Sequence, residues 1–261
     1  MDLAQLAQRQ LDDFDAHHPG LIFEGDSLSL TQAEAYDLQF KVAALRESRG
    51  EQVAGYKIGC MSETVRRQLG LNHPVFGHVF QSELHSSGCV LDPNCYEGLA
   101  IEGEFAVRIG EDIERSVSPA FPVIELHNYI FRSSTGAAQE LIGNNAIHAG
   151  VVLPATESFS IDPEDLQHEP ISVWINGELQ GTSDGSAAPE VIGAALLSVT
   201  RHLERFGSCI KKGQIVLTGS PLPLYRVEPG DQVEVRFWRF PPVTASIMNR
   251  VVASVHPTAH V

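Results

Sequence analysis

The sequence is poor in positive charge. Lys and Arg total 18 against 33 Asp and Glu, which gives a formal net charge of -15. A surface that binds nucleic acid or an anionic membrane needs basic patches, so both kinds of partner are disfavoured. A small anionic substrate remains compatible with this charge, because one lysine and a metal ion can outweigh it locally.

Cysteine is scarce as well, with four residues whose spacing fits no zinc pattern such as Cys-x-x-Cys. A core of this size needs no disulfides, so we expect free thiols in a reducing compartment. The acidic N-terminus has no signal-peptide core, and no run approaches the roughly 18 apolar residues of a membrane span. A Gly-x-Ser-x-Gly elbow and a glycine-rich phosphate loop are also missing. These absences predict a cytoplasmic protein whose chemistry uses neither motif.

The pattern of apolar runs and turn-forming residues predicts one α/β domain over 1–261, rich in β-structure. Helices are expected mainly in an N-terminal region, 1–50, and near 190–206. Through the predicted catalytic core, 51–250, short apolar runs alternate with Gly, Pro, Asn and Asp, as strands do. The helix near 190–206 is expected to bury an apolar stripe made of Val191, Ala194, Ala195, Val199 and Leu203.

Local signals place individual elements. Helical spacing covers 2–17, and a second helix is expected over 31–48. Thr31 would be its N-cap, and Glu34 would complete a capping box. Further along, Asn176-Gly177 between two alternating runs predicts a tight β-hairpin turn.

Two glutamates lie one residue apart in the apolar segment LAIEGEFAVRIG, which spans 99–110. Side chains alternate between the faces of a strand, so Glu102 and Glu104 share one face, roughly 6.5 Å apart, while the other face is apolar. Like charges so placed repel unless water or a cation separates them. Two interpretations stay open: a solvated strand face, or half of a site for Mg²⁺ or Mn²⁺, which prefer carboxylate oxygens.

Glu125 and Lys57 extend the argument, because each is a charged residue within an apolar run. A buried carboxylate is costly without a partner, so Glu125 pairs either with an arginine or with a divalent ion shared with the first two glutamates. Lys57 lies between Gly55 and Gly59, which allow close backbone approach. It is either a strand lysine whose ammonium reaches solvent, or a site lysine that holds a substrate carboxylate or transfers a proton.

Other polar segments carry weaker signals. Thr218, Gly219 and Ser220 follow an apolar run and offer amides and hydroxyls that could bind a carboxylate, although most such sequences are simple turns. Asn144 precedes Asn145 in a segment for which turn chemistry is the simpler interpretation. The histidines near these segments are each more often structural than catalytic; they are His73, His78, His127 and His148.

These motifs, in this order, resemble the 2-keto-4-pentenoate hydratase and 4-oxalocrotonate decarboxylase group of the fumarylacetoacetate hydrolase superfamily. The resemblance covers residues 50–240. It rests on Gly-x-Lys-x-Gly, on Glu-x-Glu followed by a third Glu, and on the segments QLGLNHPVFGHVF, NNA, GQIVLTGS and VEPGD. It implies a β-rich mixed sandwich or roll with N-terminal helices, and a homodimer or larger homo-oligomer.

The resemblance also implies roles for individual residues. Glu102, Glu104 and Glu125 would bind Mg²⁺ or Mn²⁺, and Lys57 would be the active-site lysine. The loop 218–220 would help to hold the substrate carboxylate. Asn144 is a further candidate for contact with the substrate.

Two positions depart from the family pattern. Val75 stands where family hydratases usually have an Asp thought to work in proton transfer, and Asn144 stands where many members have Asp. Hydration of a 2-hydroxydienoate (2-oxopent-4-enoate type) from aromatic catabolism is still the first expectation. Val75 favours, as runner-up, a C–C bond hydrolase of an acylpyruvate such as maleylpyruvate or fumarylpyruvate, and a 2-oxo acid decarboxylase comes third. His73, His78 or Glu63 would activate water.

The three reactions share one requirement. A divalent cation chelates the carboxylate and 2-oxo oxygens of the substrate and stabilises the enolate that forms, while Lys57 adds positive charge or moves a proton. A non-catalytic partner of a related enzyme is the other class of function open to this sequence. Such a scaffold has no reason to keep the carboxylates and the lysine, so we expect an enzyme that takes a small 2-oxo acid.

Overall fold

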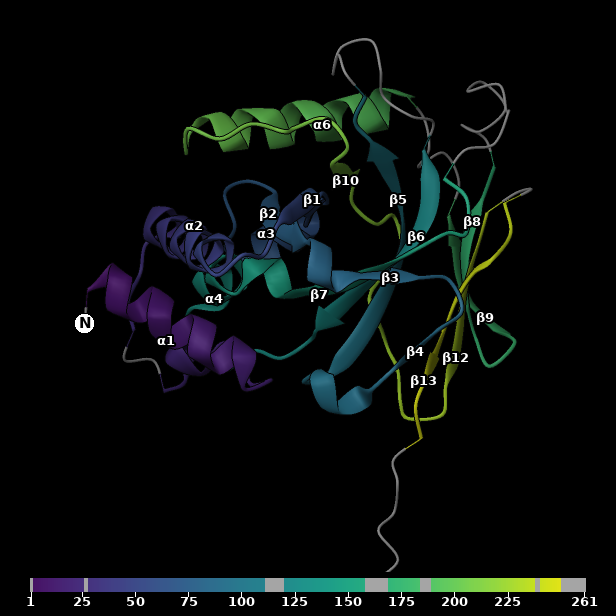
Figure 1. Ribbon diagram of the computed structural model, residues 1–261, viewed down its shortest axis with the longest axis horizontal. Coiled ribbons are helices and arrows are strands. Elements are labelled where there is room, and N and C mark those ends of the chain that lie inside the picture. The colour runs from purple at the N-terminus through teal and green to yellow at the C-terminus, as the bar shows by residue number, and fades with distance from the viewer. Residues whose placement is uncertain are drawn as a thin grey trace, which may run out of the picture.

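Two β-sheets and a set of helices make up the fold (Figure 1). The computed structural model describes residues 2–25, 28–110, 120–157, 169–183, 189–237 and 240–249. The smaller sheet packs against one side of the larger sheet, and α1, α2 and α4 lie on the other side. This arrangement confirms the expected β-rich α/β fold with N-terminal helices.

The described helices lie mostly near the N-terminus. The α-helices are α1 (Leu3–Asp15), α2 (Gln32–Ser48), α3 (Glu63–Leu69), α4 (Ala137–Gly143) and α6 (Pro189–Glu204). Short 3-10 turns are η1 (Leu21–Phe23), η2 (Gln81–Glu83), η3 (Pro93–Cys95) and η4 (Asn145–Ile147). Among these helices, none is long and apolar enough to cross a membrane.

The larger sheet is mixed, with strand order β2-β1-β10-β5-β6-β7-β3 and with β11 paired to β5. From β10 through β5 and β6 to β7, neighbouring strands are antiparallel, whereas β1 runs parallel to β10 and β3 runs parallel to β7. Its strands are β1 (Val53–Gly59), β2 (Val75–Phe80), β3 (Leu84–Ser86), β5 (Leu99–Arg108), β6 (Phe121–Asn128), β7 (His148–Leu153), β10 (Ile215–Leu217) and β11 (Tyr225–Arg226).

The smaller sheet has the order β4-β13-β12-β8-β9. Its strands are β4 (Cys89–Leu91), β8 (Ile171–Ile175), β9 (Glu178–Ser183), β12 (Gln232–Phe237) and β13 (Val243–Ile247). Apolar side chains fill the space between the two sheets. The ring of Phe105 on β5, for example, meets that of Phe237 on β12 edge to face, with 4.7 Å between the ring centroids.

Several local predictions are confirmed. Thr31 caps α2, and its backbone N–H donates to the Glu34 carboxylate at 2.8 Å, which completes the capping box. Asn176 and Gly177 have φ of 54° and 78° and connect β8 to β9, as a tight hairpin requires. All four cysteines are free thiols.

The predicted buried stripe of α6 is partly wrong. Ala195, Val199 and Leu203 are buried, but Val191 and Ala194 are exposed. Ile192 and Leu196 pack against the core in their place. Both edges of the helix are apolar, so the sequence allowed two stripes, and packing against the sheet selected between them.

Gly103 separates the two glutamates of β5 and faces the smaller sheet. A Cβ atom at this position would lie 2.7 Å from a methyl carbon of Val173 on β8 and 3.1 Å from one of Val235 on β12. The missing side chain therefore lets the sheets approach each other here. Because neighbouring side chains on a strand point the opposite way, the glutamates on either side of Gly103 face away from the smaller sheet.

We expect Gly103→Ala to lower the free energy of unfolding by about 1–3 kcal/mol, because the added methyl group overpacks the contact between the sheets. Chemical denaturation measures this loss. In the double variant Gly103→Ala/Val173→Ala the loss should be smaller than the sum of the two single losses, since a shorter Val173 makes room for the methyl group. Strict additivity would contradict the contact.

Candidate functional site

The pairing of β5 with β6 brings the glutamates together. Glu102 lies directly opposite Glu125 in the antiparallel register, and residues so paired have Cβ atoms about 4.5–5.5 Å apart. Glu104 is fully buried and Glu125 is 1% exposed, while the Glu102 side chain is 20% exposed. The interpretation of this face as a solvated one is therefore wrong.

Lys57 projects from β1 into the same cluster. Its Nζ lies 3.2 Å from Oε1 of Glu125 and 3.5 Å from the carbonyl oxygen of Ala146. The residue is 4% exposed, so its ammonium does not reach solvent. Two glycines leave room for it: a Cβ at Gly59 would lie 3.2 Å from Nζ, and one at Gly77 would lie 3.2 Å from Cγ of the lysine.

A strained turn supplies the carbonyl that faces Lys57. Asn145, Ala146 and Ile147 have φ of 52°, 54° and 54°, a left-handed conformation that costs roughly 1–2 kcal/mol for each residue with a side chain. Asn145 ties this turn to β2, because its side chain accepts from the N–H of His78 and donates to the His78 carbonyl, both at 2.8 Å. Strain of this kind is concentrated at functional sites.

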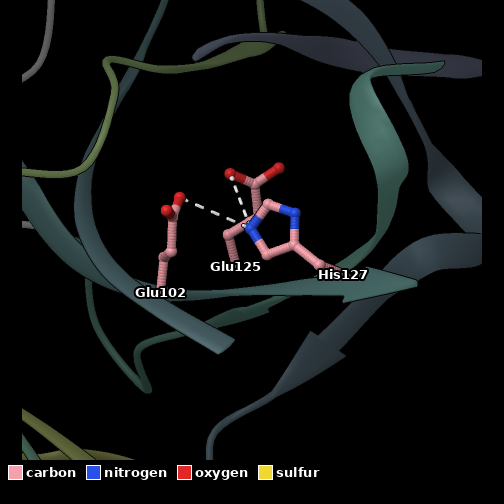
Figure 2. Close-up of side chains that lie close together, drawn as sticks. All are labelled: Glu102, Glu125 and His127. Atoms are coloured by element: carbon pink, nitrogen blue, oxygen red, sulfur yellow. Dashed lines mark ion pairs between the residues drawn. The ribbon is translucent and has the colours of Figure 1, made fainter. Parts of the chain in front are cut away.

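Two histidines flank Glu125. His127 follows it by two residues on β6, and its Nε2 lies 3.4 Å from Oε2 of Glu102 and 3.5 Å from Oε2 of Glu125. Figure 2 shows this nitrogen directed toward both carboxylates. His148 begins β7, and its Nδ1 lies 2.6 Å from Oε1 of Glu125. Alternation along β6 was a sequence signal for His127, whereas His148 is brought in by the pairing of β6 with β7.

A chain of polar contacts continues from His148 to the N-terminal helices. His148 Nε2 lies 3.7 Å from Oε2 of Glu83. The other oxygen of Glu83 accepts from Arg46 of α2 at 2.7 Å, and the guanidinium of Arg46 lies over the ring of Phe80, 3.6 Å from its centroid. Sequence reasoning did not find Arg46 or Glu83, because their partners are remote in the chain.

The ion pair of Lys57 with Glu125 keeps both groups charged. Burial alone would raise the pKa of Glu125, but Lys57, His127 and His148 outweigh it and hold that pKa well below its usual range. Burial alone would lower the pKa of Lys57, but the neighbouring carboxylates, Glu125 foremost, outweigh it and raise that pKa. The pair is therefore ionised at neutral pH.

Glu104 has no comparable partner. Burial, together with repulsion from Glu125 and Glu102, raises the pKa of Glu104 well above its ordinary value. Neither of its two buried oxygens has a hydrogen-bond partner. An unpaired carboxylate in a buried cluster is costly, and a divalent cation is the group that would compensate it.

The residues therefore fit a divalent metal ion. In the described part of the chain, one ligand atom each from Glu102, Glu125 and His127 lie within 4.8 Å of one another. The predicted ligand set was Glu102, Glu104 and Glu125. The structure brings Glu102 and Glu125 together with His127. Glu104 is buried beside them and is repelled by both glutamates, and its role as a metal ligand stays a prediction.

The loop after β10 lies along β5, beside the glutamates. The N–H and the hydroxyl of Thr218 both donate to the carbonyl of Phe105, at 2.9 and 3.0 Å. The Ser220 hydroxyl lies 3.0 Å from the carbonyl of Gly103, and Gly219 between them has a φ of 95°. The hydroxyls thus hold the loop to the strand on both sides of Glu104, and contact with a substrate stays a prediction.

The remaining predicted residues lie elsewhere. The Asn144 side chain accepts from Gln10 of α1 at 2.9 Å, so it contacts the helical layer. His73 and Glu63 are exposed. His78 packs among aromatic rings, 4.7 Å from that of Phe40, and burial lowers its pKa to about 3. A role of these residues in binding substrate or activating water is untested.

Comparison with curated proteins finds enzymes of one group; no family model matches the chain. The chain is 26% identical over 222 residues to 2-hydroxyhexa-2,4-dienoate hydratase of Comamonas testosteroni, which covers 79% of this chain and 82% of that protein. It is 25% identical to 2-keto-4-pentenoate hydratase of Paraburkholderia xenovorans (77% and 78% covered). It is also 25% identical to 4-oxalocrotonate decarboxylase of Pseudomonas putida (81% and 84% covered).

Solved structures show the same fold. The structure of 4-oxalocrotonate decarboxylase from Pseudomonas putida G7, complexed with magnesium and adipate, matches with a TM-score of 0.82 at 21% identity, covering 94% of this chain and 97% of that one. Fumarylpyruvate hydrolase from Pseudomonas aeruginosa, in complex with Mn²⁺ and pyruvate, matches with 0.54 at 17% identity, covering 75% and 89%. The chain is therefore similar in sequence to 2-keto-4-pentenoate hydratases and 4-oxalocrotonate decarboxylases, as its motifs predict, and it shares its fold with 4-oxalocrotonate decarboxylase.

Proposed function

We propose that this chain is a divalent-metal-dependent enzyme that acts on a small 2-oxo acid of aromatic catabolism. The observation that carries the proposal is a buried cluster in which Lys57 and three glutamates meet, with both oxygens of Glu104 left unpartnered. The names of the curated relatives support the substrate class. Magnesium and Mn²⁺ in the neighbouring structures support the choice of ion.

The residues of the cluster have separate tasks in this proposal. Glu102 and Glu125 hold the ion, with Glu104 as the carboxylate that lacks any other partner. The ion, when bound, supplies Lewis-acid stabilisation of negative charge on the 2-oxo oxygen. Lys57, fixed by Glu125 and by the Ala146 carbonyl, directs its ammonium into the site. It stabilises developing negative charge and is placed to move a proton.

Hydration of a 2-hydroxydienoate is the reaction that we place first. C–C cleavage of an acylpyruvate is the alternative, and it uses the same enolate-stabilising cluster. Both reactions add water, so both need a base that activates it. In this proposal, that base is His73, His78 or Glu63.

Decarboxylation comes third, and one observation supports it. Val75, at the position of the family Asp, is 1% exposed in β2 and offers no acid or base. His73 and Glu63 are exposed, and His78 lies among aromatic rings. Loss of CO₂ needs an electron sink but no activated water, so a site that combines Lys57 with a bound divalent ion and offers no well-placed base suits it.

Purified protein with Mg²⁺ or Mn²⁺ should convert one of three substrates: 2-hydroxypenta-2,4-dienoate, 4-oxalocrotonate or an acylpyruvate such as maleylpyruvate. Ultraviolet absorbance follows loss of the conjugated substrate, and assays of CO₂ and pyruvate separate the reactions. Lys57→Met should lower kcat by about 10²-fold or more, the usual loss when an acid–base group is removed. Glu178→Gln on β9, an exposed carboxylate, is the matched control and should retain activity. Turnover of none of the three by metal-loaded protein would overturn the proposal.

Glu104→Gln should separate stability from metal binding. The amide keeps the shape of the side chain but removes its charge. In EDTA, the free energy of unfolding of the variant should therefore be about 1 kcal/mol higher than that of wild type. Mn²⁺ should raise the melting temperature of wild type, because an ion that binds only the native state stabilises that state. It should have little effect on the melting temperature of the variant, which lacks the carboxylate of Glu104. Thermal unfolding with and without Mn²⁺ measures both effects. Equal stabilisation of the two proteins by Mn²⁺ would remove Glu104 from the site.

A further inference from the structure

We propose that His127 is a nitrogen ligand of the metal ion, and that it shifts the preference of the site from Mg²⁺ toward transition-metal ions such as Mn²⁺. The ligand set that the resemblance implies is all carboxylate, and the nitrogen of His127 would add to it. The inference rests on the proposed function, which requires the ion.

The position of His127 follows from the strand pattern. Residues two apart on a strand share a face, so His127 and Glu125 on β6 point the same way. The residue paired with His127 across β5 is Ala100, whose small side chain leaves the imidazole free to lean toward Glu102. The outcome is one Nε2 atom that faces a carboxylate oxygen from each of two strands (Figure 2).

The contacts of this nitrogen fit a shared ion better than hydrogen bonds. Its distances to Glu102 and Glu125, 3.4 and 3.5 Å, exceed the 2.7–3.2 Å of an ordinary N–H···O bond. Atoms that share an octahedral ion at about 2.1 Å lie about 3 Å apart, so a small inward movement of the ligands would enclose the ion. His127 is 1% exposed, and both of its ring nitrogens lack a hydrogen-bond partner. A buried imidazole with neither nitrogen satisfied is costly unless a ligand completes it.

His148 provides the internal comparison. It also lies beside Glu125, but its Nδ1 is only 2.6 Å from Oε1 of that carboxylate, which is a hydrogen-bonding distance. Its Nε2 faces Glu83, away from the cluster. A histidine held in this way orients a ligand rather than binding the metal. The two histidines therefore have different tasks, although both contact Glu125.

A nitrogen donor has a consequence for metal choice. Mg²⁺ takes oxygen ligands and water almost exclusively, whereas imidazole is a good ligand for transition-metal ions. Loss of the donor should weaken binding of Mn²⁺ and leave binding of Mg²⁺ nearly unchanged. Since loss of even an orienting partner costs about 10–100-fold in metal affinity, we expect His127→Gln to lower the ratio of Mn²⁺ to Mg²⁺ affinity about tenfold.

Pulsed electron paramagnetic resonance of the Mn²⁺-loaded protein tests the ligand directly, because a coordinated imidazole gives a ¹⁴N coupling. We expect this coupling in wild type and in His148→Gln, and its loss in His127→Gln. Labelling the histidines of wild type with ¹⁵N should replace the ¹⁴N signal with a ¹⁵N signal, which tests the donor even if a variant does not fold. Competition between Mn²⁺ and Mg²⁺ gives the ratio of affinities.

The outcomes separate the two proposals. Stoichiometric Mn²⁺ without nitrogen coupling in wild type would refute the role of His127 and leave the metal site intact. A ¹⁴N coupling that is retained in folded His127→Gln but lost in His148→Gln would identify His148 as the ligand and would also refute the role of His127. Absence of bound Mn²⁺ in wild type would overturn both this inference and the proposed function.

Discussion

The buried contact of Lys57 with Glu125 is the interaction on which the site depends. It places a fixed positive charge in a cluster of three carboxylates, which neutralises part of their charge. The compensation is incomplete, because Glu104 keeps two buried oxygens without partners. In the proposed function, a bound cation offsets this cost. The unpaired buried carboxylate of the metal-free protein is thus the source of its proposed affinity for a metal ion.

The rest of the structure holds this unfavourable cluster in place. Gly103 lets the two sheets close on one side of β5, so that the glutamates of that strand are directed to the other side. Thr218 and Ser220 fasten the loop after β10 to the backbone of β5. On the helical side, contacts from Arg46 through Glu83 reach His148. Elements far apart in the sequence are therefore tied to one point, as a rigid site requires.

Val75 departs from the family pattern at a position linked to proton transfer, and His127 is the residue proposed as a nitrogen ligand. Val75 is buried in β2 and carries no carboxylate, and the imidazole of His127 lies beside Glu102 and Glu125. The buried lysine and the carboxylates are present together with both residues. In the proposed function, Val75 bears on how a proton or water is handled and His127 on which ion is preferred, while the lysine and the carboxylates serve to stabilise an enolate.

The sequence by itself determined the local features. Alternation predicted that Glu102 and Glu104 share a face, the capping box predicted the start of α2, and Asn176-Gly177 predicted a hairpin, because each signal acts over a few neighbouring residues. Tertiary structure decided what depends on distant partners. The register of β5 against β6 and β7 placed Glu102 opposite Glu125 and brought in His148. Packing buried Lys57 and turned His78 toward aromatic rings. A charge pattern shows that a cluster is present, but only the fold decides which groups complete it, since desolvation and pairing depend on residues that the chain brings together from afar.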